Sequence, residues 1–176
     1  MNIKNMPIGK KFPETVNVVI EVTKGSHNKY EYDEELDVMK LDRVLYSPVH
    51  YPTDYGFIPE THSDDGDHLD ILVLCTNPTF PGCVVEGRPI GLLKMIDSGD
   101  EDFKILGVAA TDPRYAHIST LEDVNKLNPM LTEEIAHFFE VYKKLQKKET
   151  KILGWENHVM ALDEIKRAHE AFKAKK

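Results

Sequence analysis

The chain has 176 residues, a length typical of one compact domain, and no linker-like segment divides it, so we expect a single domain over residues 1–176. Its 22 Lys and Arg against 30 Asp and Glu give a formal net charge of −8, which argues against a nucleic-acid partner, because such binders cluster Lys and Arg. No apolar stretch approaches the roughly 20 residues that span a bilayer, and two cysteines form no disulfide framework. We therefore expect a cytoplasmic protein without a membrane partner.

The first half of the chain has the patterns of short strands. Some segments alternate apolar and polar side chains, as half-buried strands do, and others are continuous apolar runs between Pro, Gly and Asp turns. The predicted strands cover residues 16–22, 29–33, 38–45, 71–75, 89–95 and 103–110. Because no helical period separates them, we expect a small, closed or nearly closed antiparallel barrel.

The second half has helical spacing. Thr120 and Asp123 resemble a capping box, and Asn128 followed by Pro129 resembles a cap and a first helical residue. The predicted helices cover residues 120–127, 129–148 and 157–173. The fold class is therefore predicted to be α+β, with flanking helices mostly in the C-terminal half.

An acidic loop follows the third predicted strand. The segment Asp64-Asp65-Gly66-Asp67-His68-Leu69-Asp70 places four carboxylates in seven residues, and Asp97 and Asp102 flank a second acidic loop. Mutual repulsion is costly unless a cation lies among them, and carboxylates without a Cys or His cluster favour Mg²⁺, with Mn²⁺ as a substitute. A solvated acidic turn is the alternative. An EF-hand is excluded, since Asp70 stands where its Gly belongs.

Magnesium commonly completes its shell with substrate phosphates, which predicts cations that hold phosphoryl oxygens. The candidate cations are Lys29, Arg43, Lys104 and Lys143. Tyrosines can add hydroxyl groups to such a site, with core packing as the alternative. The candidate tyrosines are Tyr51, Tyr55 and Tyr142.

The loop Asp65-Gly66-Asp67-His68-Leu69-Asp70-Ile71 closely resembles the signature of the soluble family I inorganic pyrophosphatases, bacterial type. The resemblance covers almost the whole chain. Its other segments are Val19-Ile20-Glu21, Lys29-Tyr30-Glu31, Asp42-Arg43, Tyr51-Pro52, Tyr55-Gly56-Phe57, Leu93-Lys94-Met95, His137-Phe138-Phe139-Glu140 and Gly154-Trp155. It implies a five-stranded OB-like β-barrel, hydrolysis of pyrophosphate to two orthophosphates with several Mg²⁺ ions, and a homohexamer.

The resemblance also implies a role for each matching residue. Asp67 orients the attacking water and takes its proton, Tyr55 supports the nucleophile, and Glu21 and Tyr51 support the cavity. The implied metal ligands are Glu31, Asp65, Asp70, Asp97 and Asp102. The implied phosphate-binding residues are Lys29, Arg43, Lys104, Tyr142 and Lys143. His68 departs from the family pattern, which usually has Pro or an acid there.

Two metal ions that share one water favour direct in-line attack on the phosphorus, without a covalent intermediate. Two other function classes use the same features. A non-catalytic module for divalent cations needs the carboxylates but gives Arg43, Lys104 and Lys143 no task. An OB-like nucleic-acid binder needs a basic groove with stacking aromatic side chains.

Overall fold

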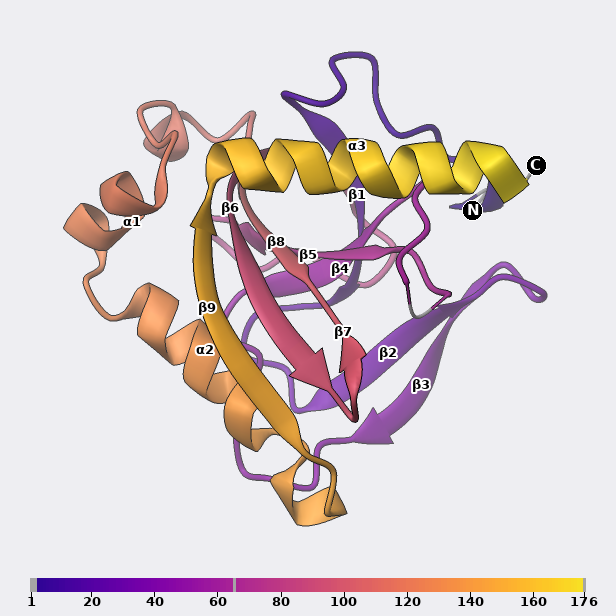
Figure 1. Cartoon of the computed structure of the whole chain (residues 1–176), viewed down its shortest axis with the longest axis vertical. Helices are drawn as coiled ribbons and strands as arrows, with labels where there is room; N and C mark the ends of the chain where they lie inside the picture. Colours follow the sequence, from indigo (N-terminus) through magenta and orange to yellow (C-terminus); the bar gives the residue numbers. More distant parts are fainter. Residues whose placement is uncertain (1–2, 65, 176) are drawn as a thin grey trace.

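The computed structural model describes residues 3–64 and 66–175, which form a group of strands with helices on two of its sides (Figure 1). The strands are β1 (Val16–Val22), β2 (Asn28–Asp33), β3 (Val38–Val44), β4 (Asp54–Ile58), β5 (Leu69–Leu74), β6 (Val84–Asp97), β7 (Asp100–Glu101), β8 (Lys104–Ala109) and β9 (Thr150–Asn157). The helices are α1 (Leu121–Leu127), α2 (Leu131–Val141) and α3 (His158–Lys175), with 3₁₀ turns at Ile3–Asn5, Pro113–Tyr115 and Lys144–Gln146. The mixed α+β class and the C-terminal position of the helices are confirmed.

Five strands form a closed ring in the order β1-β4-β5-β8-β6, in which β6 pairs again with β1. Strands β7 and β9 pair with β6, and β2 and β3 form a separate hairpin. The prediction that all strands are antiparallel is wrong, because β5 and β8 are parallel. Parallel neighbours need a crossover connection, and here the chain crosses through β6 before it returns as β8.

Three strands were not predicted: β4, the two-residue β7 and β9. β4 is buried along its whole length, and at Gly56 a Cβ atom would lie 1.9 Å from the carbonyl oxygen of Val19 in β1. Only glycine permits this close approach, and a glycine inside a short run weakens the strand pattern. β9 pairs with β6 through an irregularity at Gly154, whose φ of 126° also breaks the alternation.

The first and last helices follow their predictions closely. Thr120 Oγ1 accepts a hydrogen bond from Asp123 N at 3.2 Å, and Asp123 Oδ2 accepts one from Thr120 N at 3.1 Å, so the capping box is present. α3 begins after Asn157, whose Oδ1 accepts from Val159 N at 3.0 Å. It ends at Lys175, two residues beyond the prediction.

The predicted bounds of the middle helix are wrong at both ends. Asn128 ends α1, and its Oδ1 accepts from Met130 N at 3.2 Å, which places Pro129 in a turn and delays the start of α2 to Leu131. The chain leaves α2 after Val141, and a 3₁₀ turn then ends at Lys147 with a φ of 57°. The apolar spacing of the sequence thus extends beyond Val141, the last residue of the hydrogen-bonded helix.

Apolar side chains on the two faces of the ring form separate cores. Ile71 and Val73 of β5 belong to the inner core, which takes side chains from all five ring strands and from α3. Leu72 and Leu74 belong to the outer core, which packs against α2. This two-sided burial explains the continuous apolar run of β5. Among the helices in the described ranges, none is long and apolar enough to cross a membrane.

Candidate functional site

A buried lysine stands at the centre of the candidate site. Lys104, on β8, is 2% exposed, and its Nζ donates to Asp70 Oδ2 at 2.6 Å and to Asp102 Oδ1 at 2.7 Å. Parallel pairing causes the first contact, because Lys104 stands opposite Asp70 in the register of β5 and β8. Tyr55 of β4 donates its hydroxyl to the same Asp70 oxygen, and the Phe139 ring centroid lies 5.2 Å from Lys104 Nζ.

A second ion pair joins Asp97, at the end of β6, to Lys143, which follows α2. The neighbouring Tyr142 is buried, and its ring centroid lies 5.1 Å from Lys143 Nζ. Tyr51 is also buried, with its ring centroid 5.4 Å from that of Tyr55. These tyrosines pack in the outer core, as the alternative interpretation of the sequence expected.

The β2–β3 hairpin holds the third group. Lys29 and Arg43 are opposite each other in the strand register. Lys29 pairs with Glu31, and Asp42 pairs with Arg43 and lies 3.8 Å from Lys29 Nζ. The hairpin therefore places two cations beside two carboxylates, all partly exposed, on a ribbon outside the ring.

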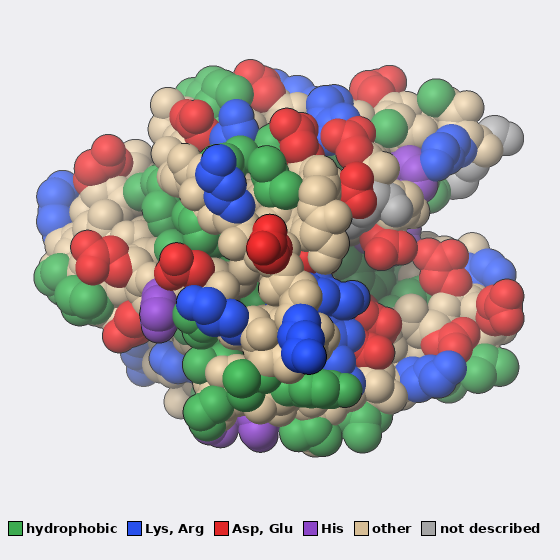
Figure 2. Space-filling model, turned by 60° about the horizontal axis from the view of Figure 1, so that its bottom comes forward, with side chains coloured by type: hydrophobic (Ala, Val, Ile, Leu, Met, Phe, Trp, Pro, Cys, Tyr) green, Lys and Arg blue, Asp and Glu red, His purple; other side chains and the backbone are tan. Residues whose placement is uncertain are grey.

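A cavity of about 530 Å³ lies between this hairpin and the end of α3. Figure 2 shows a notch on this face of the molecule, with acidic side chains along its edges. Six residues predicted for the site line the cavity: Glu21, Lys29, Glu31, Tyr55, Asp67 and Asp70. Asp67 is exposed to it, whereas Glu21 is 8% exposed and accepts a hydrogen bond from Tyr32 N at 2.7 Å.

Other predicted residues lie beside the cavity lining. Lys104 joins the cavity to the residues beside it, because it binds Asp70, which lines the cavity, and Asp102, which is outside the lining. Asp65 falls outside the described residues. Within the described ranges, no three carboxylate, His or Cys side chains meet in one metal-holding group. Four of the predicted ligands are instead paired with ammonium groups: Glu31, Asp70, Asp97 and Asp102.

Burial and neighbouring charges shift several pKa values in opposite directions. Burial lowers the pKa of Lys104, but the charges of Asp70 and Asp102 outweigh it and hold this pKa well above its usual value. Burial raises the pKa of Asp97, but the hydrogen bond and charge of Lys143 bring it below its usual value. Lys104 therefore remains cationic at neutral pH, whereas burial lowers the pKa of Lys143 despite the hydrogen bond and charge of Asp97.

The carboxyl group of Glu21 has a pKa close to neutral pH. Burial, opposed by the hydrogen bond from Tyr32 N and assisted by the charge of Asp70, raises its pKa to about 8. The folded chain retains this proton between the usual pKa of 4.5 and about 8, whereas the unfolded chain releases it. Stability from this group is therefore present at low pH and is lost as pH rises through that window.

We expect Glu21→Gln to remove this pH dependence. In chelator, the free energy of unfolding of the parent chain falls between pH 5 and 8 by up to about 1.4 kcal/mol per pH unit more than that of the variant. Urea unfolding across this range measures the difference, with the exposed Glu101→Gln as the control. Parallel curves for the parent chain and Glu21→Gln would contradict the assignment.

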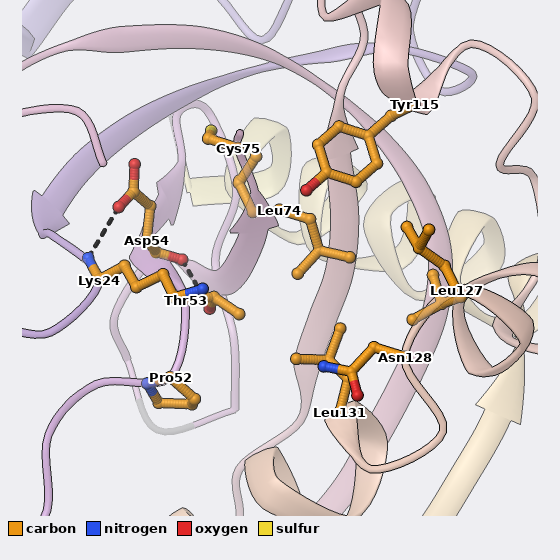
Figure 3. Close-up of a pocket in the computed structure, with 12 residues that line it drawn as sticks. Lys24, Pro52, Thr53, Asp54, Leu74, Cys75, Tyr115, Leu127, Asn128 and Leu131 are labelled. Carbon is orange, nitrogen blue, oxygen red and sulfur yellow. Dashed lines mark hydrogen bonds between the residues drawn. The ribbon is translucent and has the colours of Figure 1, made fainter. Parts of the chain in front are cut away.

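A second, smaller pocket of about 100 Å³ lies between β5, α1 and α2. Figure 3 shows Asp54 among its lining residues, with Oδ1 accepting from Lys24 N at 2.8 Å. The other carboxylate oxygen accepts from Thr79 N at 2.9 Å. The described lining residues of this pocket include none of the predicted site residues. The Asp54 carboxylate therefore joins the loops that contain Lys24 and Thr79.

Two contributors were missed in the sequence. Asp42 holds both hairpin cations, and Phe139 places its ring beside Lys104. Asp42 is adjacent to Arg43 in the sequence, so that pair was a usable signal. The position of Phe139 had no such signal, because an aromatic residue at helical spacing indicates only a buried face.

Comparisons with known proteins identify a family for this chain. A family model described as inorganic pyrophosphatase matches residues 18–173. An inorganic pyrophosphatase of a Nostoc species is 52% identical over 166 residues, which are 94% of this chain and 94% of that protein.

Two solved structures are similar to this chain over nearly its whole length. Inorganic pyrophosphatase from Thermus thermophilus has a TM-score of 0.93 and 48% identity, with 98% of this chain and 99% of that chain covered. The enzyme from Helicobacter pylori has a TM-score of 0.89 and 35% identity, with 96% and 99% covered. The similarity thus includes the strands that position Asp70, Lys104 and Tyr55.

Proposed function

The chain belongs to the inorganic pyrophosphatase family, which supports hydrolysis of pyrophosphate as its reaction, and on that premise we propose magnesium-dependent hydrolysis to two orthophosphates by direct attack of water. The observation that supports the finer proposal most is the buried Lys104 between Asp70 and Asp102. It places a fixed cation and two carboxylates at one end of the ring, beside a cavity open to solvent.

The donor set fits magnesium. The site carboxylates offer hard oxygen atoms, and Asp70 and Asp102 already hold one cation between them. We propose that Glu31, Asp65, Asp70, Asp97 and Asp102 hold Mg²⁺, with Mn²⁺ as a substitute. When bound, the ions neutralise phosphate charge and lower the pKa of the attacking water.

The protein residues divide the remaining work. Asp67 is exposed in the cavity, where its carboxylate can orient the water and accept its proton. Tyr55 fixes Asp70 through its hydroxyl hydrogen bond. The proposed phosphate-binding residues are Lys29, Arg43, Lys104, Tyr142 and Lys143. Their charges oppose the repulsion between a polyanionic substrate and the acidic loop.

Release of phosphate from pyrophosphate, with magnesium and with excess chelator, tests the proposal. We expect hydrolysis with magnesium and its loss with chelator. Binding of magnesium without hydrolysis would instead support a non-catalytic cation module. A phosphorylated residue trapped during turnover would contradict direct attack by water.

The resemblance supports three further properties. We propose that the ring is an OB-like barrel, that the single domain over residues 1–176 assembles as a homohexamer, and that the protein works in the cytoplasm. Analytical ultracentrifugation tests the hexamer, and a monomer at micromolar concentration would contradict it.

His68 is held by its own contacts in this chain. One ring nitrogen lies 2.8 Å from Thr61 O, the other lies 3.2 Å from Glu34 Oε1, and the ring stacks on Phe57 at 4.8 Å between centroids. We expect His68→Pro to change turnover and magnesium affinity by less than about a hundredfold, or roughly 2.7 kcal/mol, because no proposed ligand is removed. Steady-state kinetics across magnesium concentrations measure both, and a larger change would contradict this expectation.

A further inference from the structure

Residues 60–64 and 66–68 contain most of the acidic loop, and hydrogen bonds close the base of this segment. Thr61 Oγ1 accepts from Leu69 N at 2.9 Å and donates to Ile58 O. Farther along the loop, Ser63 N donates to Asp67 O at 2.8 Å. These bonds shape the loop, and other contacts attach it to the rest of the molecule.

One turn of α3 makes that attachment through three consecutive residues. Arg167 Nη1 donates to Asp64 Oδ1 at 2.9 Å, Ala168 O accepts from His62 N at 2.9 Å, and His169 Nδ1 donates to Glu60 O at 2.6 Å. Helix residues 167–169 thus hold loop residues 60, 62 and 64, more than 100 positions away in the sequence.

The contact at His169 is the most constrained of the three. His169 is 8% exposed, and the centroid of the Phe12 ring lies 4.9 Å from that of its ring. Its partner Glu60 has a φ of 54°, in the left-handed region that non-glycine residues rarely adopt. The buried ring of His169 therefore fixes the carbonyl of Glu60, which has an uncommon conformation and directly precedes Thr61 at the base of the loop.

We propose that helix residues 167–169 are positioning residues that set the magnesium affinity of the acidic loop, an inference that rests on the proposed function. Asp67 lies on this loop and lines the cavity together with the proposed ligands Glu31 and Asp70. Movement of the loop base therefore displaces the Asp67 carboxylate, whereas Asp70 is held on β5 by Tyr55 and Lys104. Carboxylates held in place before the ion arrives lose less conformational entropy on binding. The C-terminal helix thereby acts on the site without contributing a ligand.

Four variants test the proposal. His169→Leu removes the hydrogen bond to Glu60 O, and His169→Asn keeps a side-chain N–H near the position of Nδ1. Arg167→Met removes the contact with Asp64 and also the pair with Glu164 on the same helix. Lys173→Met is the control, since Lys173 pairs with Glu170 on the exposed face of the same helix. Titration calorimetry with magnesium alone measures affinity, kinetics at saturating magnesium measure kcat and KM, and thermal unfolding confirms folding.

We expect His169→Leu to weaken magnesium binding by about tenfold or more, the effect typical of residues that support metal ligands. Arg167→Met shows a smaller loss, His169→Asn recovers most of the affinity, and kcat at saturating magnesium stays close to the parent value. Lys173→Met matches the parent chain throughout.

Unchanged magnesium affinity in folded His169→Leu and Arg167→Met would overturn the inference. If His169→Leu does not fold, the half-exposed Arg167 contact still decides the question through its own variant. Absence of pyrophosphate hydrolysis by the parent chain refutes the proposed function instead, and the calorimetric comparison still decides the positioning role.

Discussion

Asp67→Asn is expected to lower kcat for pyrophosphate hydrolysis by about 10²- to 10⁴-fold, the usual contribution of a positioned general base. Asn keeps the size of the side chain but cannot take a proton from the attacking water. Because Asp67 is exposed in the cavity, its replacement leaves the packed core unchanged. Phosphate release at saturating magnesium and pyrophosphate, together with the unfolding temperature, measures both effects.

The matched control is Asp163→Asn, which makes the same charge change at an exposed position on α3. It should retain the parent kcat. If Asp67→Asn also retained kcat at neutral pH, the proton would have another acceptor and the role proposed for Asp67 would be wrong.

Lys104→Met has the second large effect, on stability as well as activity. Removing the ammonium group leaves Asp70 and Asp102 facing each other without their shared cation, and loss of one partner from a buried pair typically costs about 3–5 kcal/mol. Loss of a charged contact to phosphate lowers kcat/KM by about 10- to 100-fold. Urea unfolding in chelator and initial rates with excess magnesium measure the two effects.

Magnesium should restore part of the stability lost in Lys104→Met, because a bound cation again offsets the two carboxylates. The control Lys94→Met removes a lysine of β6 whose Nζ lies 5.2 Å from the Phe103 ring centroid. Such a contact contributes about 0.5–1 kcal/mol, so its loss should be small. Equal losses of stability in the two variants would show that Lys104 does not offset the charges of Asp70 and Asp102.

Sequence patterns predicted most of the local structure. The alternation over residues 16–22 matches β1, and the Thr120 and Asp123 pair caps α1 as expected. Predictions failed where a nonlocal contact decided the local conformation. β4 depends on the close approach of β1 to Gly56, and β9 depends on pairing with β6. Neither contact leaves a periodic trace in its own segment.

The residues proposed for the site come from the acidic loop and its resemblance to a family signature. The contact between β5 and β8 at the site was not predicted. Asp70 and Lys104 meet because β5 and β8 are parallel, a register that the predicted antiparallel barrel lacked. The attachment of Glu60 to His169 was likewise absent from the pattern, since an apolar helix face gives no information on which loop it will meet.

By itself, the sequence determined most of the segments, the acidic loop and the kinds of chemistry that its side chains can perform. Local periodicity suffices for these features, because burial of one face acts between residues a few positions apart. Tertiary structure alone decided the parallel closure of the ring, the position of Lys104 between two carboxylates and the support of the loop by α3. The reason is that these contacts join distant segments whose shared burial and hydrogen bonding must offset the entropy of bringing them together.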